Sequence, residues 1–335
     1  MGPAPDGREV VRLVGDVGGT HARFALVAGP NGRPFSELTS ATADHPDLAA
    51  AVVDYLARTG RTVREAAVAI ADTMDGDGVA MTNGPWSFSI EATRQQLGLD
   101  RLLMLNDWEA MAFAVPALCD SDLLQIGRGA SVASAPRGLI GPGTGLGVSS
   151  LVRSRGGEWV PIAGEGGHVT LAPTCVREAD ILRTVWRDHS HISAERLVSG
   201  MGLENLYRAI ATLDGVAPED LSAADVTARG LANGDASCAE ALATFCSLLG
   251  NVAGNLALTL GARGGIYIGG GIVRRLGDYF ASSPFRRQFE AKGRFASYLA
   301  AIPTWVVQAD NPALTGAAMA LGVQPADRFP ASTPS

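Results

Sequence analysis

The sequence predicts an α/β protein with two lobes, and two observations lead to this prediction. Short apolar runs of strand length, such as 67–71 and 102–105, are separated by helix-like stretches, which is the layering of an α/β fold. Two glycine-rich turns of one kind, at 15–20 and 141–147, lie far apart in the chain, and strand-like runs flank each of them. A repeated unit at domain-sized separation predicts two related lobes that share a ligand in the cleft between them.

The size and charge of the chain narrow the class of protein. It has 335 residues, of which 47% are hydrophobic and 18% charged, so it can form two domains with sizeable cores. The formal net charge is −7, and no dense run of Lys and Arg is present. Because a nucleic-acid surface needs such a run to neutralise phosphates, we expect no nucleic-acid partner.

Cysteine spacing and the apolar segments favour a cytoplasmic location. The four cysteines include no C-x-x-C pair, which favours reduced thiols over a zinc site or a disulfide framework. Residues 1–9 lack the layout of a signal peptide and are interpreted as a loose leader. The uncharged stretch 241–262 is long enough to span a bilayer, but Asn251, Asn255 and its glycines favour a buried helix. We therefore expect no membrane association.

The strands and helices follow in chain order. The apolar run 10–17 ends at Gly18-Gly19-Thr20 and resumes at 22–27, which predicts a β-hairpin with a glycine-rich tip. A second hairpin is expected from 138–141 and 148–152, around the other glycine turn. The remaining patterns predict helices at 178–187, 202–213 and 236–261, a strand at 265–268 that ends in three glycines, and a closing helix at 311–321.

Both glycine turns have the chemistry of a phosphate-binding loop. In the first, Gly15, Gly18 and Gly19 let backbone amides approach an oxygen-rich ligand, Thr20 can donate its hydroxyl, and Asp16 can hold a metal ion through water. Gly143-Thr144-Gly145 repeats this pattern, with Thr144 as the donor to a terminal phosphate. Neither turn matches the Walker or the dinucleotide fingerprint. An ordinary hairpin turn is the alternative for a lone glycine pair.

Five segments resemble, in order, those of the bacterial glucokinase family: 13–20 with Arg23, Leu105-Asn106-Asp107, Gly164-Glu165-Gly166-Gly167-His168, Ser193-Ala194-Glu195-Arg196, and Gly269-Gly270-Gly271-Ile272. The match covers about 11–321. This resemblance implies a two-lobed actin-like ATPase (ribonuclease H-like) fold that phosphorylates glucose with ATP and Mg²⁺. It also implies a homodimer, a small domain of 10–117 plus about 309–322, a large domain of 118–308, and a tail at 323–335.

Asn106 and Asp107 are the candidates for catalysis. They follow an apolar strand, so their side chains would lie at the carboxyl end of a strand, where open α/β sheets bind ligands. Asn and Asp are also favoured helix N-caps, and the residues alone leave both interpretations open. The resemblance implies that Asp107 is the general base, which takes the proton of the sugar's 6-hydroxyl as that oxygen attacks the γ-phosphorus.

Three further side chains are candidates for sugar binding. Glu165 and His168 lie in a glycine-flanked loop that resembles the family's sugar loop, and Glu195 would contribute from a third segment. A structural histidine and a helix-start carboxylate are the alternative interpretations. Carboxylates accept hydrogen bonds from neutral hydroxyls and repel anionic substrates, so a neutral sugar is favoured. Gly269, Gly270 and Gly271 resemble the family's adenosine-binding turn; a simple tight turn is the alternative.

Two positions depart from the family pattern. Asp72-Thr73 replaces a Gly-Pro or Cys-Pro pair, and His21 replaces an Asn that commonly follows Gly-Gly-Thr. These changes bear on the preference for glucose more than on kinase activity. Two other functions stay open at this point: a sugar-sensing regulator of the repressor-and-kinase superfamily, and a kinase with another hexose or another phosphate donor.

Overall fold

The computed structural model describes residues 10–29, 32–72, 74, 76–82 and 84–322. The chain forms two compact units, each with its own sheet and core: the first contains 1–118, 159–163 and 309–335, and the second contains 119–158 and 164–308. The expected leader at 1–9 and tail at 323–335 lie outside the described residues.

The first unit is built on a five-stranded sheet with the order β3-β2-β1-β4-β7. β1 (Val11–Val17) and β2 (His21–Ala28) form an antiparallel hairpin, and β3 (Phe35–Ala41) pairs antiparallel with β2. β4 (Glu65–Ile70) runs parallel to β1, and β7 (Arg101–Asn106) runs parallel to β4. The central strands β1 and β4 are mostly buried because both faces of the sheet are covered.

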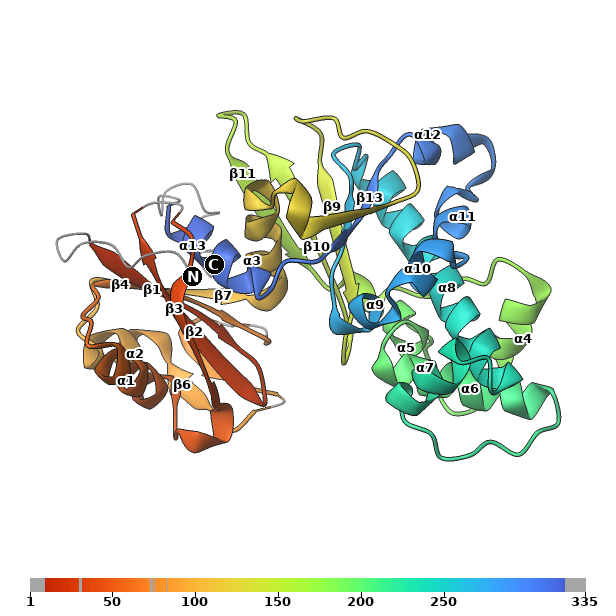
Figure 1. The fold of residues 1–335 in the computed structure, drawn as a ribbon, viewed down its shortest axis with the longest axis horizontal. Coiled ribbons are helices and arrows are strands. Elements are labelled where there is room, and N and C mark those ends of the chain that lie inside the picture. The colour runs from red at the N-terminus through yellow and green to blue at the C-terminus, as the bar shows by residue number, and fades with distance from the viewer. Residues whose placement is uncertain (1–9, 30–31, 73, 75, 83, 323–335) are drawn as a thin grey trace, which may run out of the picture. The chain divides into compact units, whose positions relative to one another are not determined.

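Helices cover both faces of this sheet. On one face, α1 (Leu48–Thr59) and α2 (Ile90–Gln96) lie together, as Figure 1 shows. On the other, α13 (Pro312–Leu321) contacts α3 (Asp107–Ala114) and the strands β4 and β1. The two helices approach so closely that a Cβ on Gly316 would lie 1.7 Å from the carbonyl oxygen of Ala110. A small two-stranded sheet, β5 (Gly78–Ala80) with β6 (Ser87–Ser89), completes the sheets of this unit.

A six-stranded sheet with the order β11-β10-β9-β12-β13-β8 forms the base of the second unit. β9 pairs antiparallel with β10, β12 runs parallel to β9 and to β13, and β8 is antiparallel to β13. Residues 159–163 of the edge strand β11 belong to the first unit. The strands are β8 (Leu123–Ile126), β9 (Arg137–Pro142), β10 (Leu146–Arg153), β11 (Trp159–Gly164), β12 (Ile266–Ile268) and β13 (Thr304–Val307).

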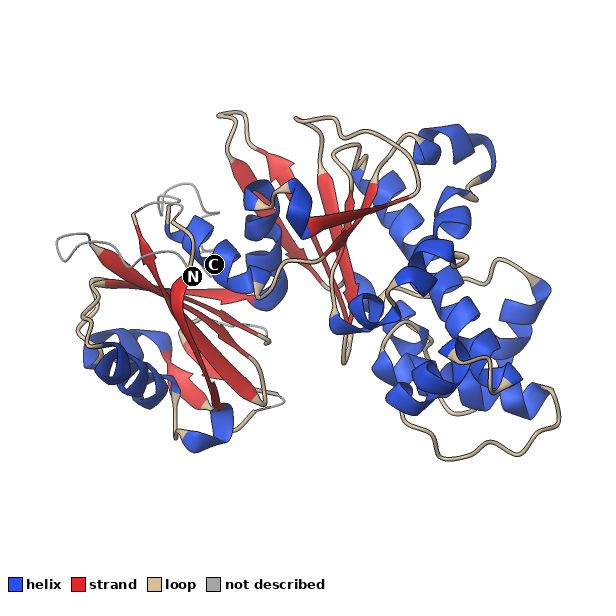
Figure 2. Ribbon diagram, viewed as in Figure 1, coloured by secondary structure: helices blue, strands red, loops and turns tan. Residues whose placement is uncertain are grey.

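The helices of the second unit gather on one side of its sheet (Figure 2). They are α4 (Val176–Val185), α5 (Ala194–Leu197), α6 (Gly200–Leu213), α7 (Ala223–Leu231), α8 (Ala236–Leu260), α9 (Gly271–Leu276), α10 (Asp278–Ser282), α11 (Phe285–Glu290) and α12 (Ala296–Ala300). Within the described part of the chain, α8 is the one helix long and apolar enough to cross a membrane, and 67% of its most apolar window is buried. This burial is that of a core helix, as the sequence predicts.

The two sheets share one strand plan. In each, an antiparallel hairpin with a glycine tip is followed, on the side of its first strand, by two parallel strands: β4 and β7 in the first sheet, β12 and β13 in the second. The predicted α/β layering and the repeated glycine hairpin are therefore confirmed.

Candidate functional site

Three strands of the first unit end at the same level. Val17 lies beside Ile70 across β1 and β4, and Ile70 lies beside Asn106 across β4 and β7. The tip Gly18-Gly19-Thr20, the departure at Asp72 and the candidate base Asp107 directly follow these ends. Strands two places apart in a sheet are separated by about 10 Å. The fold thus brings the phosphate-type turn and Asp107 to one edge of the same sheet.

One hydrogen bond within the hairpin and two from Thr42 hold the glycine tip. The amide of Gly18 donates to the carbonyl of His21 at 2.9 Å. The hydroxyl of Thr42 donates to the carbonyl of Gly18 at 2.9 Å, and the Thr42 amide donates to the carbonyl of Thr20 at 3.0 Å. Thr42 is fully buried. Sequence reasoning missed this residue, which carries no motif; its only signal is a threonine directly after an edge strand.

Gly15 and Asp16 have different environments. A Cβ on Gly15 would lie 3.0 Å from the ring of Phe24 and 3.2 Å from a methyl carbon of Val68, so glycine allows close packing there. The carboxylate of Asp16 lies 3.3 Å from the guanidinium of Arg23. Burial raises the pKa of Asp16, and Arg23 partly opposes this rise. A cation beside the carboxylate would act in the same direction as Arg23.

The donor set fits magnesium. Among the described residues no cluster of three or more His, Cys, Asp or Glu side chains is present. A site with one carboxylate suits Mg²⁺, because this ion keeps several waters and takes its other ligands from substrate phosphates. Asp16, one residue before the end of β1 and next to the open tip at Gly18, has this arrangement.

Asn106 and Asp107 begin α3. The side-chain oxygen of Asn106 accepts a hydrogen bond from the Trp108 amide at 2.9 Å, which makes Asn106 the N-cap of the helix. Its amide nitrogen donates to the carbonyl of Asp72 at 3.2 Å. An oxygen of the half-buried Asp107 also accepts from the Trp108 amide, at 2.9 Å. The N-cap interpretation therefore holds for Asn106, and this cap fixes the backbone from which Asp107 projects.

Asp72, which differs from the residue usual in the family, stabilises a loop through hydrogen bonds. Its carboxylate accepts hydrogen bonds from the amide of Thr82 and, at 3.2 Å, from the Thr82 hydroxyl. Its carbonyl accepts from Asn106, so Asp72 links the end of β4 to the start of α3. Thr73 lies outside the described residues. His21, the other departure, is exposed at the start of β2.

The second unit brings two glycine turns to one sheet edge. Ile268 at the end of β12 lies beside Ile140 of β9, and the Gly269 amide donates to the Ile140 carbonyl at 2.9 Å. Gly270 has φ +88°, and a Cβ there would lie 2.2 Å from the carbonyl oxygen of Pro142. Because Pro142 directly precedes Gly143-Thr144-Gly145, the glycine triplet contacts the base of that turn.

Glu195 holds the turn that carries Thr144. It lies in the first turn of α5, and one carboxylate oxygen accepts a hydrogen bond from the Leu146 amide at 2.9 Å. A Cβ on Gly145 would lie 2.4 Å from the same oxygen, so a larger residue there would displace the Glu195 carboxylate from this position. The sequence predicts a sugar contact for Glu195 and does not indicate this bond. The sugar contact stays a prediction.

Glu165 directly precedes a short 3₁₀ turn, Gly166–His168, and His168 is the last residue of that turn. The His168 amide donates to the Glu165 carbonyl at 3.0 Å, both side chains are exposed, and the imidazole lies 4.0 Å from the carboxylate. A Cβ on Gly167 would lie 2.1 Å from the carbonyl oxygen of Leu146, so the loop rests on the start of β10. Leu146 thus joins three predicted elements: the Thr144 turn, Glu195 and the Glu165–His168 loop.

Comparison with known proteins gives consistent matches over nearly the whole chain. A family model described as Glucokinase matches residues 13–324. A glucokinase from Chromobacterium violaceum is 54% identical over 308 residues, covering 92% of this chain and 88% of the relative. The crystal structure of a glucokinase from an Antarctic psychrotroph is 33% identical with a TM-score of 0.87, covering 93% of this chain and 98% of that chain.

A more distant structure shares the fold. A glucokinase of the ROK family from Streptomyces griseus, solved with glucose and AMPPNP, is 19% identical with a TM-score of 0.60 and covers 93% of this chain and 98% of that chain. The two-lobed kinase fold expected from the sequence is confirmed by these structures.

Proposed function

The chain belongs to the glucokinase family and is an ATP-dependent glucokinase, and from this premise we propose that Asp107 is its general base. The observation that carries the proposal is the strand register, which sets Asp107 and the Gly18–Thr20 tip at one sheet edge. A sugar-sensing regulator is set aside, because relatives at about half identity over most of the chain are glucokinases.

The carboxylate of Asp107 accepts the proton of the glucose 6-hydroxyl as that oxygen attacks the terminal phosphorus of ATP. A positioned base of this kind contributes about 10²- to 10⁴-fold to the rate. The remaining acceleration comes from alignment of the two substrates and from exclusion of water, which competes with the sugar hydroxyl. The Asn106 cap supports this role because it fixes the first turn of α3, to which Asp107 belongs.

Glucose is held by Asn106, Asp107, Glu165, His168 and Glu195. The exposed side chains of Glu165 and His168 support this assignment, since they are accessible to a ligand. The carboxylates accept hydrogen bonds from sugar hydroxyls and repel anionic substrates. Glu195 touches the Thr144 turn through Leu146, so the same carboxylate reaches toward both substrates.

ATP lies along the backbone amides of three turns, Gly18–Thr20, Gly143–Gly145 and Gly269–Gly271. The Streptomyces griseus glucokinase was solved with glucose and AMPPNP, which supports one site for both ligands in this fold. Asp16 holds Mg²⁺ through water, and the ion, when bound, neutralises charge on the phosphate oxygens. Gly15 serves packing and brings Asp16 to the edge of the sheet.

The two units correspond to a small domain, 10–117 with about 309–322, and a large domain, 118–308. The boundaries of the compact units at Leu118 and Gln308 support this division. The enzyme is cytoplasmic and homodimeric, as the family resemblance implies. ATP is the phosphate donor and glucose is the preferred sugar. Asp72, which differs from the residue usual in the family, is the position most suited to alter the range of sugars accepted.

The test is the substitution Asp107→Asn. Turnover should fall about 10²- to 10⁴-fold, while the dissociation constant for glucose, measured by calorimetry, stays within a few-fold of wild type. Asp100→Asn is the matched control, because Asp100 is an exposed carboxylate paired only loosely with Arg64, at 3.6 Å, and should leave turnover unchanged. Near-normal turnover of Asp107→Asn would remove the proposed role. A panel of sugars and donors, including ADP and polyphosphate, tests the substrate range.

A further inference from the structure

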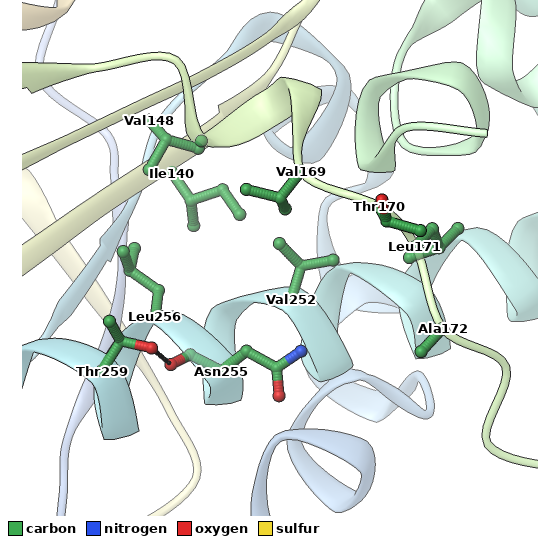
Figure 3. Close-up of a pocket in the computed structure, with 11 residues that line it drawn as sticks. Ile140, Val148, Val169, Thr170, Leu171, Ala172, Val252, Asn255, Leu256 and Thr259 are labelled. Atoms are coloured by element: carbon green, nitrogen blue, oxygen red, sulfur yellow. Dashed lines mark hydrogen bonds between the residues drawn. The ribbon is translucent and has the colours of Figure 1, made fainter. Parts of the chain in front are cut away.

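A cavity in the second unit is lined by none of the side chains assigned to substrate binding above. It has a volume of about 260 Å³ and opens between the β9–β10 hairpin, the segment 166–172 and α8. Figure 3 shows the side chains around it, which are mainly aliphatic. The apolar lining comes from Ile140, Val148, Val169, Leu171, Val252 and Leu256. Val169, Ala172 and Thr259 are exposed, so the cavity opens to solvent, and an apolar pocket of this size is a candidate ligand site.

The lining determines the chemical class of the ligand. Among the described residues, no charged side chain lines the cavity, so a charged ligand would lose its hydration without compensation. A dry apolar cavity of about 150 Å³ is enough to bind benzene. The larger volume here suits an uncharged bicyclic aromatic molecule.

Asn255 adds one directional group at the rim. The Lys292 ammonium donates to the side-chain oxygen of Asn255 at 2.7 Å. Since an ammonium can only donate, this bond sets the orientation of the amide and leaves its NH₂ group as a donor toward the cavity. The amide nitrogen is drawn at the lower edge of the cavity in Figure 3. A ring nitrogen or carbonyl on the ligand would accept this bond.

The cavity lies directly behind the loop assigned to sugar binding. Gly166 and Val169 line it, and they flank His168 in the sequence. A Cβ on Gly166 would lie 2.7 Å from a methyl carbon of Val148, so the loop already contacts the hairpin closely at one point. Ile140 and Val148 come from the two strands joined by the Thr144 turn. A bound molecule would therefore brace the loop against the hairpin.

We propose that this cavity is a regulatory site for an uncharged bicyclic aromatic molecule with one hydrogen-bond acceptor, and that its occupation increases the affinity for glucose. The effect on glucose rests on the proposed sugar contacts of Glu165 and His168. Ordering the loop in advance reduces the entropy that glucose binding must overcome, which gives positive coupling. By linkage, glucose increases the affinity for the ligand by the same factor.

Quinoline is the probe, since it is bicyclic, uncharged at neutral pH and carries one ring nitrogen acceptor. Its binding to the full-length protein is measured by calorimetry without glucose, so this result does not depend on catalysis. Thr259→Phe at the rim should fill the mouth of the cavity and weaken quinoline binding at least 10-fold. Thr212→Phe is the matched control, because both threonines are exposed on helices and donate to the carbonyl four residues earlier.

Ala172→Phe fills the opposite rim and provides a second variant if Thr259→Phe fails to fold, as judged by melting temperature. In wild type and Thr212→Phe, saturating quinoline should lower the KM for glucose about 5-fold or more, and the rim variants should lose this response. Absent binding to wild type, or equal binding to both rim variants, would overturn the site. Binding with an unchanged KM would overturn the regulatory role, whether or not Asp107 is the base.

Discussion

Thr42 holds the glycine tip of the first hairpin by a side-chain bond to Gly18 and a backbone bond to Thr20. A variant that loses this side-chain bond tests whether Thr42 acts by positioning the glycine tip. Thr42→Val keeps the shape but leaves the Gly18 carbonyl without its partner, so the free energy of unfolding should fall by about 1–2 kcal/mol. The KM for ATP should rise, and the KM for glucose should stay unchanged.

Denaturant unfolding and steady-state kinetics check this prediction. Thr42→Ser is the control, because it retains the hydroxyl and should restore the KM for ATP. An unchanged KM for ATP in Thr42→Val, with the expected loss of stability, would limit Thr42 to a purely structural role.

Lys292 is the only lysine in the sequence, so its side chain can be observed alone. Burial lowers the pKa of Lys292 below its ordinary value of 10.5, and the residues to which it donates hydrogen bonds, Asn251 and Asn255, are uncharged. A depressed pKa favours the neutral amine in the folded state. Lys292 therefore lowers stability where it is charged, and this effect disappears as the pH rises from the folded-state pKa to 10.5.

Protein labelled with ¹³C-lysine should give a single ε-carbon signal, and its titration gives the pKa directly. A value below 10.5 is expected. The same titration after denaturation provides the reference, and a folded-state value at or above this reference would contradict the assigned environment.

At the scale of elements, α13 fixes the start of α3 through one close contact. A Cβ on Gly316 would meet the Ala110 carbonyl oxygen at 1.7 Å, so Gly316→Ala must push the two helices apart. The free energy of unfolding should fall by about 1–3 kcal/mol. Because Asp107 belongs to the displaced helix, turnover should fall as well.

Gly78→Ala is the control for this variant, since a Cβ at Gly78 meets no atom within 4 Å and φ there is not positive. Chemical denaturation and turnover of both variants make the comparison. If Gly316→Ala and Gly78→Ala had the same free energy of unfolding, the prediction would be wrong, because α3 and α13 could then separate without cost.

Two kinds of element could be predicted from the sequence: strands that are buried on both faces, and a helix that contains a long stretch without charged residues. β1, β4, β9 and β10 are nearly continuous apolar runs, and α8 follows from its uncharged stretch. β3 was missed because FSELTSA is polar at the sheet edge, with no buried residue. The short α5 has too few residues to show a period, although it carries Glu195.

The candidate site was predictable where a motif is local. The glycine turns and the Asn106–Asp107 strand end could be found because each follows a strand. Thr42, the link from Asp72 to Asn106, and the bond from Glu195 to Leu146 join residues distant in sequence. Only the folded chain brings such pairs together, so no pattern in one sequence could reveal them.

At the scale of the whole molecule, the two units repeat one strand plan, and each presents a threonine-bearing glycine turn at a sheet edge. The proposed reaction needs both edges, because Asn106, Asp107 and the Gly18–Thr20 tip belong to the first unit, whereas Glu165, His168, Glu195 and the Thr144 turn belong to the second. Neither unit alone should phosphorylate glucose.

The most direct test of this account is a crystal structure of the enzyme with glucose, AMPPNP and Mg²⁺. The account predicts a carboxylate oxygen of Asp107 about 2.6–3.2 Å from the 6-hydroxyl of glucose, with the terminal phosphate next to the Gly18–Thr20 tip. A complex in which glucose is bound but Asp107 points away from the 6-hydroxyl would contradict it.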